Sequence, residues 1–434
     1  MTRRTLQLLL LIAVSSAGAM GQIDCISGPA SQKLVCQFPF ATGVFKNDSA
    51  LGGTQGIQSA VKAAGVFNSA IGTQVSQLPL ASASAGTVVV YKAGVPETFN
   101  NLGPILTDRA QTVGKHRFFL GGTASQFVFT DIDGISLGKL PFAFYATAFQ
   151  NGTNTVLSNT YTTENTRLAF KINQYIGVAT YGVSNRMDVS VIVPITRVSL
   201  GATTYNSTSY ILDANNNFIF GPYTNPQTYS PGTASGVGDI TFNSKFEFWR
   251  GERATVSAGM NFRTPTGDDL NYLGSGAWGF NPYLVYSYLS KISPHVKIGY
   301  QWNTATELNN PTDTPGGNLA LPGGVQYDVG ADWAMLKRVT VAGDLLGNQY
   351  LNAPRLVSTT IPLPTTLPPP ASPSKVELPT IVPETSSYTI NNLSAGLKWN
   401  PFRNLVLAGN VLFQLNNNGL RSRPTPLVGI SYKF

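Results

Sequence analysis

Polar and charged side chains alternate with apolar ones in several segments, and the charged ones, of both signs, are the residues most able to give this chain a chemistry. In DITFNSKFEF (239–248) and ATVSAGMNFR (254–263), the polar and charged positions lie opposite a face that includes Ile, Phe, Val and Met. This period of two is typical of a β-strand whose faces meet different surroundings. If the apolar face meets lipid, the opposite face lines a pore, and the candidates are Asp239, Lys245, Glu247, Arg263, Lys297, Asp328, Asp332 and Lys398.

Two uses are open for such charges. Oppositely charged side chains can set a transverse field for polar solutes, or they can pair with one another and fill a narrow barrel. Pairing is favoured because a barrel of this size has little spare lumen. Catalysis is not expected, since the two histidines, His116 and His295, cannot be matched to a serine and an acid. The chain is predicted not to be an enzyme and to need no cofactor or metal.

The alternation repeats along most of the chain after residue 114, which predicts the elements that carry these charges. Short links such as SNRM and RGER alternate with long ones, as in outer-membrane barrels. The fold class is therefore all-β, a transmembrane antiparallel β-barrel of about 12 strands (12–14) over 114–434. The predicted strands are 115–131, 165–182, 187–200, 237–249, 253–264, 277–290, 294–304, 324–335, 338–347, 386–399, 404–415 and 424–434. Soluble β-sandwiches and β-helices also use short alternating strands.

The first residues have the features of an export signal. Arg3 and Arg4 precede an apolar run over 6–14 and a small-residue site at 17–19, so residues 1–21 are predicted to be a secretory signal peptide. An exported chain fits the barrel, because outer-membrane proteins must first leave the cytoplasm.

The mature chain has few features of other protein classes. Its two cysteines, Cys25 and Cys36, are predicted to form one local disulfide in an oxidising compartment. The formal net charge of the full sequence is +8, including Arg3 and Arg4 of the signal peptide, but the basic residues are scattered singly. Nucleic-acid binding is therefore not expected.

Two regions lie outside the strand pattern. Residues 22–113 are predicted to be a small, partly helical N-terminal segment, which could either plug the barrel or pack as a periplasmic appendage. Its apolar residues recur every three or four positions, as in an amphipathic helix: Ile57, Val61, Ala64, Phe67, Ile71, Val75 and Leu78. Residues 352–383 are rich in proline, and they are predicted to form an outward, extracellular loop that does not pair as a sheet.

Several motifs together resemble a known family. LGPILTDRAQTVGKHRFFLGG (102–122), GVGDITFNSKFEF (236–248), MNFRTPTGDD (260–269), WGFNPYLVYSY (278–288) and Phe434 resemble the outer-membrane family named for a putative meta-pathway of phenol degradation. That family is itself similar to the channels for long-chain fatty acids and aromatic hydrocarbons. The resemblance covers about residues 100–434 and implies a passive channel for small hydrophobic or aromatic compounds in the bacterial outer membrane.

The resemblance also implies roles for single residues. The terminal Phe434, with Tyr432, is similar to the signal read by the barrel-assembly machinery. Pro194 interrupts a predicted strand, and in the fatty-acid channels a kink in an early strand makes a lateral gap towards the membrane. A simple bulge at Pro194 is the alternative. For the whole protein, the alternatives are a general water-filled porin and a structural or adhesive barrel that displays long surface loops.

Overall fold

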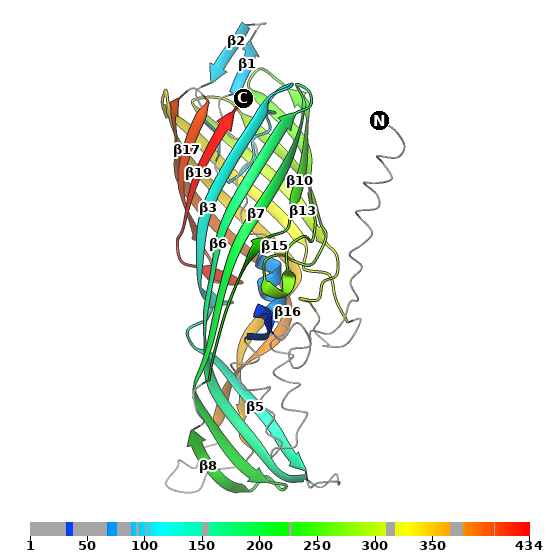
Figure 1. Ribbon diagram of the computed structural model, residues 1–434, viewed down its shortest axis with the longest axis vertical. Coiled ribbons are helices and arrows are strands. Elements are labelled where there is room, and N and C mark those ends of the chain that lie inside the picture. Colours follow the sequence, from blue (N-terminus) through cyan, green and yellow to red (C-terminus); the bar gives the residue numbers. More distant parts are fainter. Residues whose placement is uncertain are drawn as a thin grey trace.

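The computed structural model describes residues 32–37, 67–75, 88–92, 95–99, 102–104, 106–149, 156–224, 228–309, 317–364, 376–402 and 404–434. In this part the chain forms a closed, antiparallel 12-strand β-barrel (Figure 1). Its strands, in pairing order, are β3 (Phe118–Ile132), β6 (Val156–Gly182), β7 (Met187–Asp213), β10 (Thr241–Arg250), β11 (Ala254–Arg263), β12 (Gly279–Tyr288), β13 (Ile292–Asn303), β14 (Gly324–Leu336), β15 (Val339–Pro362), β16 (Glu377–Phe402), β17 (Leu405–Gln414) and β19 (Thr425–Lys433).

The last strand pairs with the first one, which closes the ring. Leu427 of β19 lies opposite Ser125 of β3, and the pairing continues to Lys433 opposite Phe119. Closure leaves no free sheet edge in the wall and satisfies the backbone polar groups there, as lipid requires. The predicted barrel is confirmed.

Short turns gather at the end of the barrel where the chain also ends (Figure 1). They join β6 to β7, β10 to β11, β12 to β13, β14 to β15 and β16 to β17. The long connections lie at the opposite end. Because outer-membrane barrels have short periplasmic turns and long extracellular loops, we name the end with Phe434 the inner end and the other the outer end.

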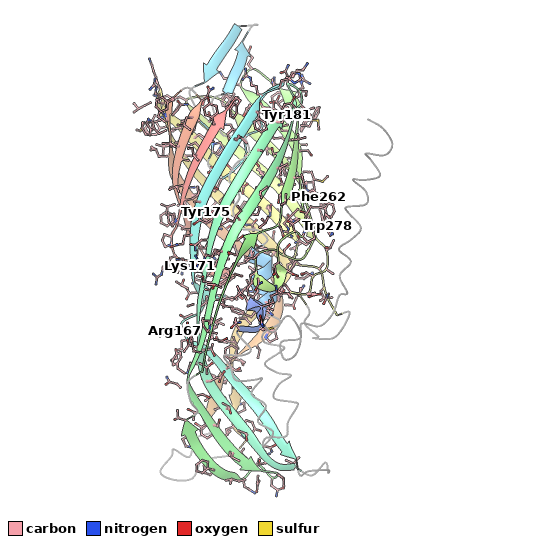
Figure 2. All side chains as sticks on the ribbon, viewed as in Figure 1. Arg167, Lys171, Tyr175, Tyr181, Phe262 and Trp278 are labelled. Atoms are coloured by element: carbon pink, nitrogen blue, oxygen red, sulfur yellow. The ribbon has the colours of Figure 1, made fainter. Side chains whose placement is uncertain are left out.

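The outward face of the wall changes from apolar to polar along β6. Tyr181 and Tyr175 face outward, with 40% and 55% of their surface exposed. Figure 2 shows Tyr181 near the inner end, Tyr175 near mid-height, and then Lys171 and Arg167 farther towards the outer end. Aromatic girdles bound the lipid-facing band of such barrels. The lipid-embedded part of β6 is therefore short, and the rest of this long strand extends above the membrane.

On the outer side of the membrane, the long strands continue as a sheet. It is completed by β4 (Ile135–Ser136), β5 (Leu140–Phe149), β8 (Phe218–Thr224), β9 (Thr228–Val237) and β18 (Leu420–Ser422). Here the inner face is the apolar one: Leu168, Phe170 and Ile172 of β6 are buried, while Arg167 next to them is exposed. Apolar side chains turn inwards because water replaces lipid outside the wall.

The prediction that residues 352–383 form an unpaired loop is wrong. β15 and β16 continue to pair through most of this stretch, with Pro354 opposite Thr385. The backbone hydrogen bond from Leu363 to Val376 fixes which positions bond across the hairpin. The four prolines of the paired stretch, Pro354, Pro362, Pro379 and Pro383, occupy the alternate positions. Their nitrogen faces away from the partner strand, so they remove no hydrogen bond between β15 and β16. The tip of the hairpin lies outside the described residues.

The N-terminal segment contributes elements at three levels. The short helix η2 (Leu34–Cys36) packs by η3 (Asp269–Asn271), which belongs to a long outer connection. Helical residues 67–75 lie inside the outer half of the barrel, and β1 (Val88–Lys92) and β2 (Val95–Phe99) form a hairpin at the inner end (Figure 1). The other residues predicted for this helix, the signal peptide and Cys25 lie outside the described residues. Within the described part of the chain, no helix is both long and apolar enough to cross a membrane.

Candidate functional site: a chamber in the barrel lumen

Residues 102–104 and 106–113, which we name the inner segment, cross the lumen near the inner end. Two lysines of the barrel wall hold its backbone. Lys245 Nζ donates to the carbonyl oxygens of Arg109 and Gln111 at 2.9 and 3.0 Å. Lys398 Nζ donates to those of Leu102 and Pro104 at 3.3 and 2.5 Å. Both lysines therefore hold the backbone of the inner segment, and these bonds do not depend on its side chains.

Ion pairs fix the middle of the inner segment. Asp108 accepts from Lys297 Nζ at 2.9 Å, and the Arg109 guanidinium lies 3.8 Å from a carboxylate oxygen of Asp332. Arg109 is only 2% exposed. Because removing one partner of a buried pair leaves an uncompensated charge, these contacts disfavour displacement of the segment.

A histidine on β13 also joins the inner segment to the wall. His295 Nε2 lies 2.8 Å from Thr107 Oγ1 and 2.8 Å from an Asp344 carboxylate oxygen. His295 is 1% exposed. A buried imidazole that bridges a wall carboxylate and the inner segment suits a positioning role.

Further bonds fasten the end of the inner segment that leads into β3. The Ala110 N–H donates to Ser287 Oγ at 3.0 Å, and its carbonyl accepts from Ser257. The Val113 N–H donates to Asp188 at 2.8 Å, and the Thr112 N–H to Glu247 at 3.4 Å. The segment is thus tied to the wall from β15 and β16 across to β7.

The outer half of the lumen is filled by apolar packing. Phe67 and Ile71 of the helical residues are 1% and 0% exposed, and they share one buried cluster with Leu34 of η2 and the inner faces of the long strands. Polar bonds place the helix as well: Ser69 donates to Asn309 at 3.0 Å, and Tyr272 donates to Asn68 at 2.5 Å. These residues form an outer plug above the inner segment.

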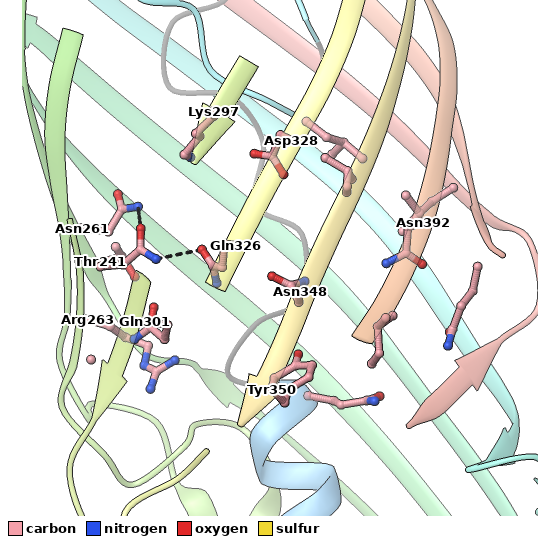
Figure 3. A pocket seen from close by; sticks show the side chains of 18 of the residues that line it. Thr241, Asn261, Arg263, Lys297, Gln301, Gln326, Asp328, Asn348, Tyr350 and Asn392 are labelled. Atoms are coloured by element: carbon pink, nitrogen blue, oxygen red, sulfur yellow. Dashed lines mark hydrogen bonds between the residues drawn. The ribbon is translucent and has the colours of Figure 1, made fainter. Parts of the chain in front are cut away.

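A cavity of about 200 Å³ remains between the outer plug and the inner segment (Figure 3). Gln74 of the helix lines it from the outer side, and Leu106 and Asp108 line it from the inner side. We name it the chamber. It is a place in the described lumen where a small solute could be held.

The chamber wall has two kinds of lining. One part is rich in carboxamides, in which Asn261 donates to Asn281 at 3.4 Å and Asn281 donates to Gln326 at 2.8 Å (Figure 3). The other part is apolar and is lined by Phe127, Phe129, Leu346, Ile390, Leu412 and Leu420. A solute with one apolar face and one hydrogen-bonding group would meet both linings.

The wall has a break at Pro194. Ile192 pairs with Thr241 and Ile195 pairs with Val237, so three residues of the β9–β10 side, 238–240, face two residues of β7. This count is a β-bulge, with Gly238 donating to the Pro194 carbonyl at 2.8 Å. A bulge at Pro194 is one of the two alternatives given by the sequence. The other, a lateral gap towards the membrane, stays a prediction.

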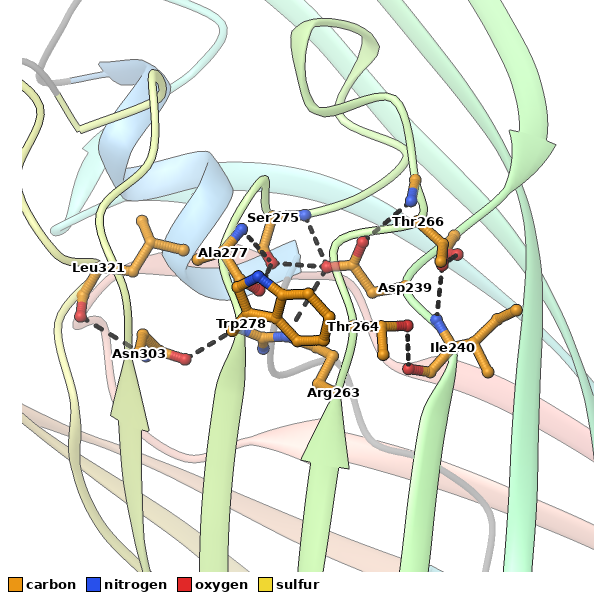
Figure 4. A network of polar contacts seen from close by, with 12 residues as sticks. Asp239, Ile240, Arg263, Thr264, Thr266, Ser275, Ala277, Trp278, Asn303 and Leu321 are labelled. Atoms are coloured by element: carbon orange, nitrogen blue, oxygen red, sulfur yellow. Dashed lines mark hydrogen bonds and ion pairs between the residues drawn. The ribbon is translucent and has the colours of Figure 1, made fainter. Parts of the chain in front are cut away.

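Asp239 sits in this break and holds an outer connection against it (Figure 4). Its carboxylate accepts from the Ser275 N–H at 2.8 Å, from Ser275 Oγ at 2.5 Å and from the Gly267 N–H at 3.1 Å. The Arg263 guanidinium lies 3.6 Å away. The connection that carries Ser275 therefore covers the break from within.

The eight charged residues predicted for the pore have different neighbours. Asp328 lies opposite Lys297 on the next strand and lines the chamber, as do Lys297 and Arg263. Asp239 lies at the break in the wall. Those that contact the inner segment are Lys245, Glu247, Lys297, Asp332 and Lys398. Most of these charged residues bind the chain's own N-terminal segment. The lumen therefore has less room for solutes than an open pore would have.

Other predicted residues are placed as follows. Cys36 is disulfide-bonded, and Cys25 is the only other cysteine in the sequence. Phe434 donates its backbone N–H to the Phe118 carbonyl at 2.8 Å, and its ring lies 4.7 Å from that of Tyr432, centroid to centroid. The assembly role of these aromatics stays a prediction.

Reasoning from the sequence missed the partners supplied by the inner segment and the carboxamides. The charged residues of LTDRAQ, Asp108 and Arg109, precede the first strand, so no strand period pointed to them. A signal did exist: the inner face of the wall carries bases and acids, and in a narrow lumen these need opposite charges or polar groups from elsewhere.

Comparison with known proteins finds one family model that matches part of the chain. Residues 146–336 match the family model described as "Putative MetA-pathway of phenol degradation". The chain thus resembles the family its motifs indicated. A search of curated proteins finds no match.

Solved structures of bacterial outer-membrane proteins are similar at low sequence identity. The COG4313 outer membrane channel from Pseudomonas putida F1 has 11% identity and a TM-score of 0.43, covering 75% of this chain and 98% of its own. A Pseudomonas aeruginosa FadL homologue has 10% identity and a TM-score of 0.33, covering 81% and 99%. The TodX monoaromatic hydrocarbon channel, as a deltaS2 mutant, has 9% identity and a TM-score of 0.34, covering 75% and 92%.

Proposed function

We propose that this protein is an outer-membrane channel for the passive uptake of small hydrophobic or aromatic compounds. The chamber is the observation that carries the proposal. Its volume of about 200 Å³ exceeds the roughly 150 Å³ of an engineered apolar cavity that binds benzene. A single aromatic ring would therefore fit, and the apolar lining around Phe127 and Phe129 would contact its faces.

The break at Pro194 supports a sideways exit. Ile192 lines the chamber, whereas Ile195 lines an apolar groove on the lipid side of the wall. Pro194 lies between these two surfaces along β7. An apolar solute that left here would enter the membrane directly, without having to pass the inner segment.

The alternatives have less support. A general water-filled porin needs a continuous aqueous lumen, but the outer plug and the inner segment occupy both ends of this one. A structural or adhesive barrel is favoured only by the sheet that extends above the membrane. That reading predicts that removal of residues 352–383 abolishes attachment and leaves permeability unchanged.

Filling the chamber tests the proposal. Leu346→Trp adds a large side chain inside the chamber, and Leu284→Trp makes the same change on the lipid face, where Leu284 is 50% exposed. We expect Leu346→Trp to slow the accumulation of radiolabelled toluene by expressing cells several-fold, with Leu284→Trp close to the wild type. Equal uptake by both variants at equal membrane levels would refute this route.

The porin alternative has its own readout. Wild-type protein in liposomes should not admit glucose in a swelling assay if the lumen is closed as described. Rapid swelling in glucose would favour the water-filled porin.

A further inference from the structure

We infer that the N-terminal segment runs through the barrel from the outer end to the inner end, so that the mature N-terminus lies on the cell surface. The inference is independent of what the channel carries. It rests on the order in which three described parts of the segment lie along the barrel.

The first part is anchored at the outer mouth, where Leu34 packs into the outer plug. Lys33 forms an ion pair with Asp268 at 2.6 Å, and the Leu34 N–H donates to Asn271 at 3.1 Å. Gln37 accepts from Ser230 of β9. These partners belong to the outer connection between β11 and β12 and to the sheet above the membrane.

The second part lies farther towards the inner end, within the mouth. Helical residues 67–75 bond to Asn309 and Tyr272 from outer connections, and Gly72 packs against Leu308. The helix also reaches down to the chamber, which Gln74 lines. From residue 33 to residue 75, the described parts of the segment thus lead from the outer mouth into the lumen.

The third part is at the inner end. The β1–β2 hairpin stands beyond the inner rim near the C-terminus (Figure 1), and the inner segment then re-enters the lumen. The closed wall separates lumen from lipid. The three parts thus lie at the outer mouth, inside the lumen and beyond the inner end. A chain with its parts in this order is threaded through the barrel. A periplasmic plug, in contrast, enters and leaves by the inner end.

The thread has an enlarged structure at each end. At the outer end, Cys36 is disulfide-bonded, and with Cys25 as the only possible partner in the chain the bond closes a small ring. At the inner end, the hairpin is wider than a single extended chain. The segment therefore cannot be expelled in either direction as a unit, and opening must take place by rearrangement inside the lumen.

Surface labelling of the unmodified protein tests the inference. Intact cells are treated with a membrane-impermeant amine reagent, and the peptides are analysed by mass spectrometry. Lys171 on the outer part of β6 is the surface control, and the exposed Lys337 in an inner turn is the periplasmic control. We expect the mature N-terminal amine to be labelled to the extent of Lys171, and Lys337 only after the cells are opened.

A tagged variant provides a second readout. An epitope inserted after Ile23 is compared with the same epitope after Asn215, in the outer turn before β8, and after Gly251, in an inner turn. Antibody should bind the first two on intact cells. Labelling of the N-terminal amine and of the Ile23 tag only in opened cells, like the inner controls, would overturn the inference.

Discussion

Two lysines act at the residue scale by bonding to the backbone of the inner segment. Lys245→Met keeps the length of the side chain but removes the donor to the Arg109 and Gln111 carbonyls. Charge-assisted bonds contribute about 2 kcal/mol, so we expect a roughly 30-fold rise in the open-to-closed ratio. Single-channel recording in planar bilayers measures it.

Lys171→Met is the matched control, because Lys171 faces outward on β6 (Figure 2). It should record as the wild type does. An open probability that is equally low in Lys245→Met would contradict a closing role for that lysine.

Asp269 gives the outer connection a pH dependence. Burial, with the nearby Glu307 carboxylate, raises the pKa of Asp269 from 3.8 to about 6. A raised folded-state pKa means that the stabilising protonated form is complete below pH 3.8 and is lost as the pH rises through about 6. The connection should therefore be less stable at neutral pH than at mildly acidic pH.

Hydrogen exchange of peptides over 264–278 measures this change. After correction for intrinsic rates, protection should fall several-fold in the wild type between about pH 5 and about pH 7, and stay nearly level in Asp269→Asn. The same fall in both proteins would assign the effect to another group.

Individual residues differ in how far the sequence predicts them. The inward side of Lys245 or Lys398 follows from the strand period, because the lipid face must be apolar. Their partners do not follow, since the inner segment has no period and reaches the wall only through the closed tertiary structure. The carboxamides of the chamber were not singled out either, because Asn and Gln are ordinary residues on any polar strand face.

At the scale of the element, Pro194 controls how β7 meets the β9–β10 side. Val at this position restores a backbone donor facing the bulge, which favours closer pairing there. We expect Pro194→Val to reduce uptake of an apolar probe such as toluene if solute leaves through the wall at this point. Accumulation by cells at matched protein levels is the measurement.

Pro282→Val provides the control for this substitution. Pro282 also lies in a barrel strand, where it pairs with Met260, but away from the bulge. Unchanged uptake in Pro194→Val would remove the sideways exit at this position.

The elements were predictable where lipid and lumen impose alternation. The ends of β11, β12, β13, β17 and β19 agree closely with the predicted ranges. β6, β7, β15 and β16 extend beyond their predictions, because above the membrane the apolar face turns inwards and the outer face becomes polar. Prolines at non-bonded positions added to the error in β15 and β16, since their number suggested a break where there is none.

At the scale of the whole molecule, the terminal aromatic completes the ring. Phe434 bonds to Phe118, the first residue of β3. Phe434→Ala should lower the amount of folded barrel in the outer membrane, measured by heat-modifiable migration on gels, more than it changes channel selectivity. Normal levels of folded protein in the variant would contradict this prediction.

The joint between β3 and β19 also sets an order of events during biogenesis. The inner segment is bonded to strands on several sides of the lumen, and the wall between β3 and β19 is closed. If the N-terminal segment is threaded as inferred, we expect it to be in position before these two strands pair. In that order of events, the pairing of β19 with β3 is the last step of folding, and it closes the barrel around the N-terminal segment.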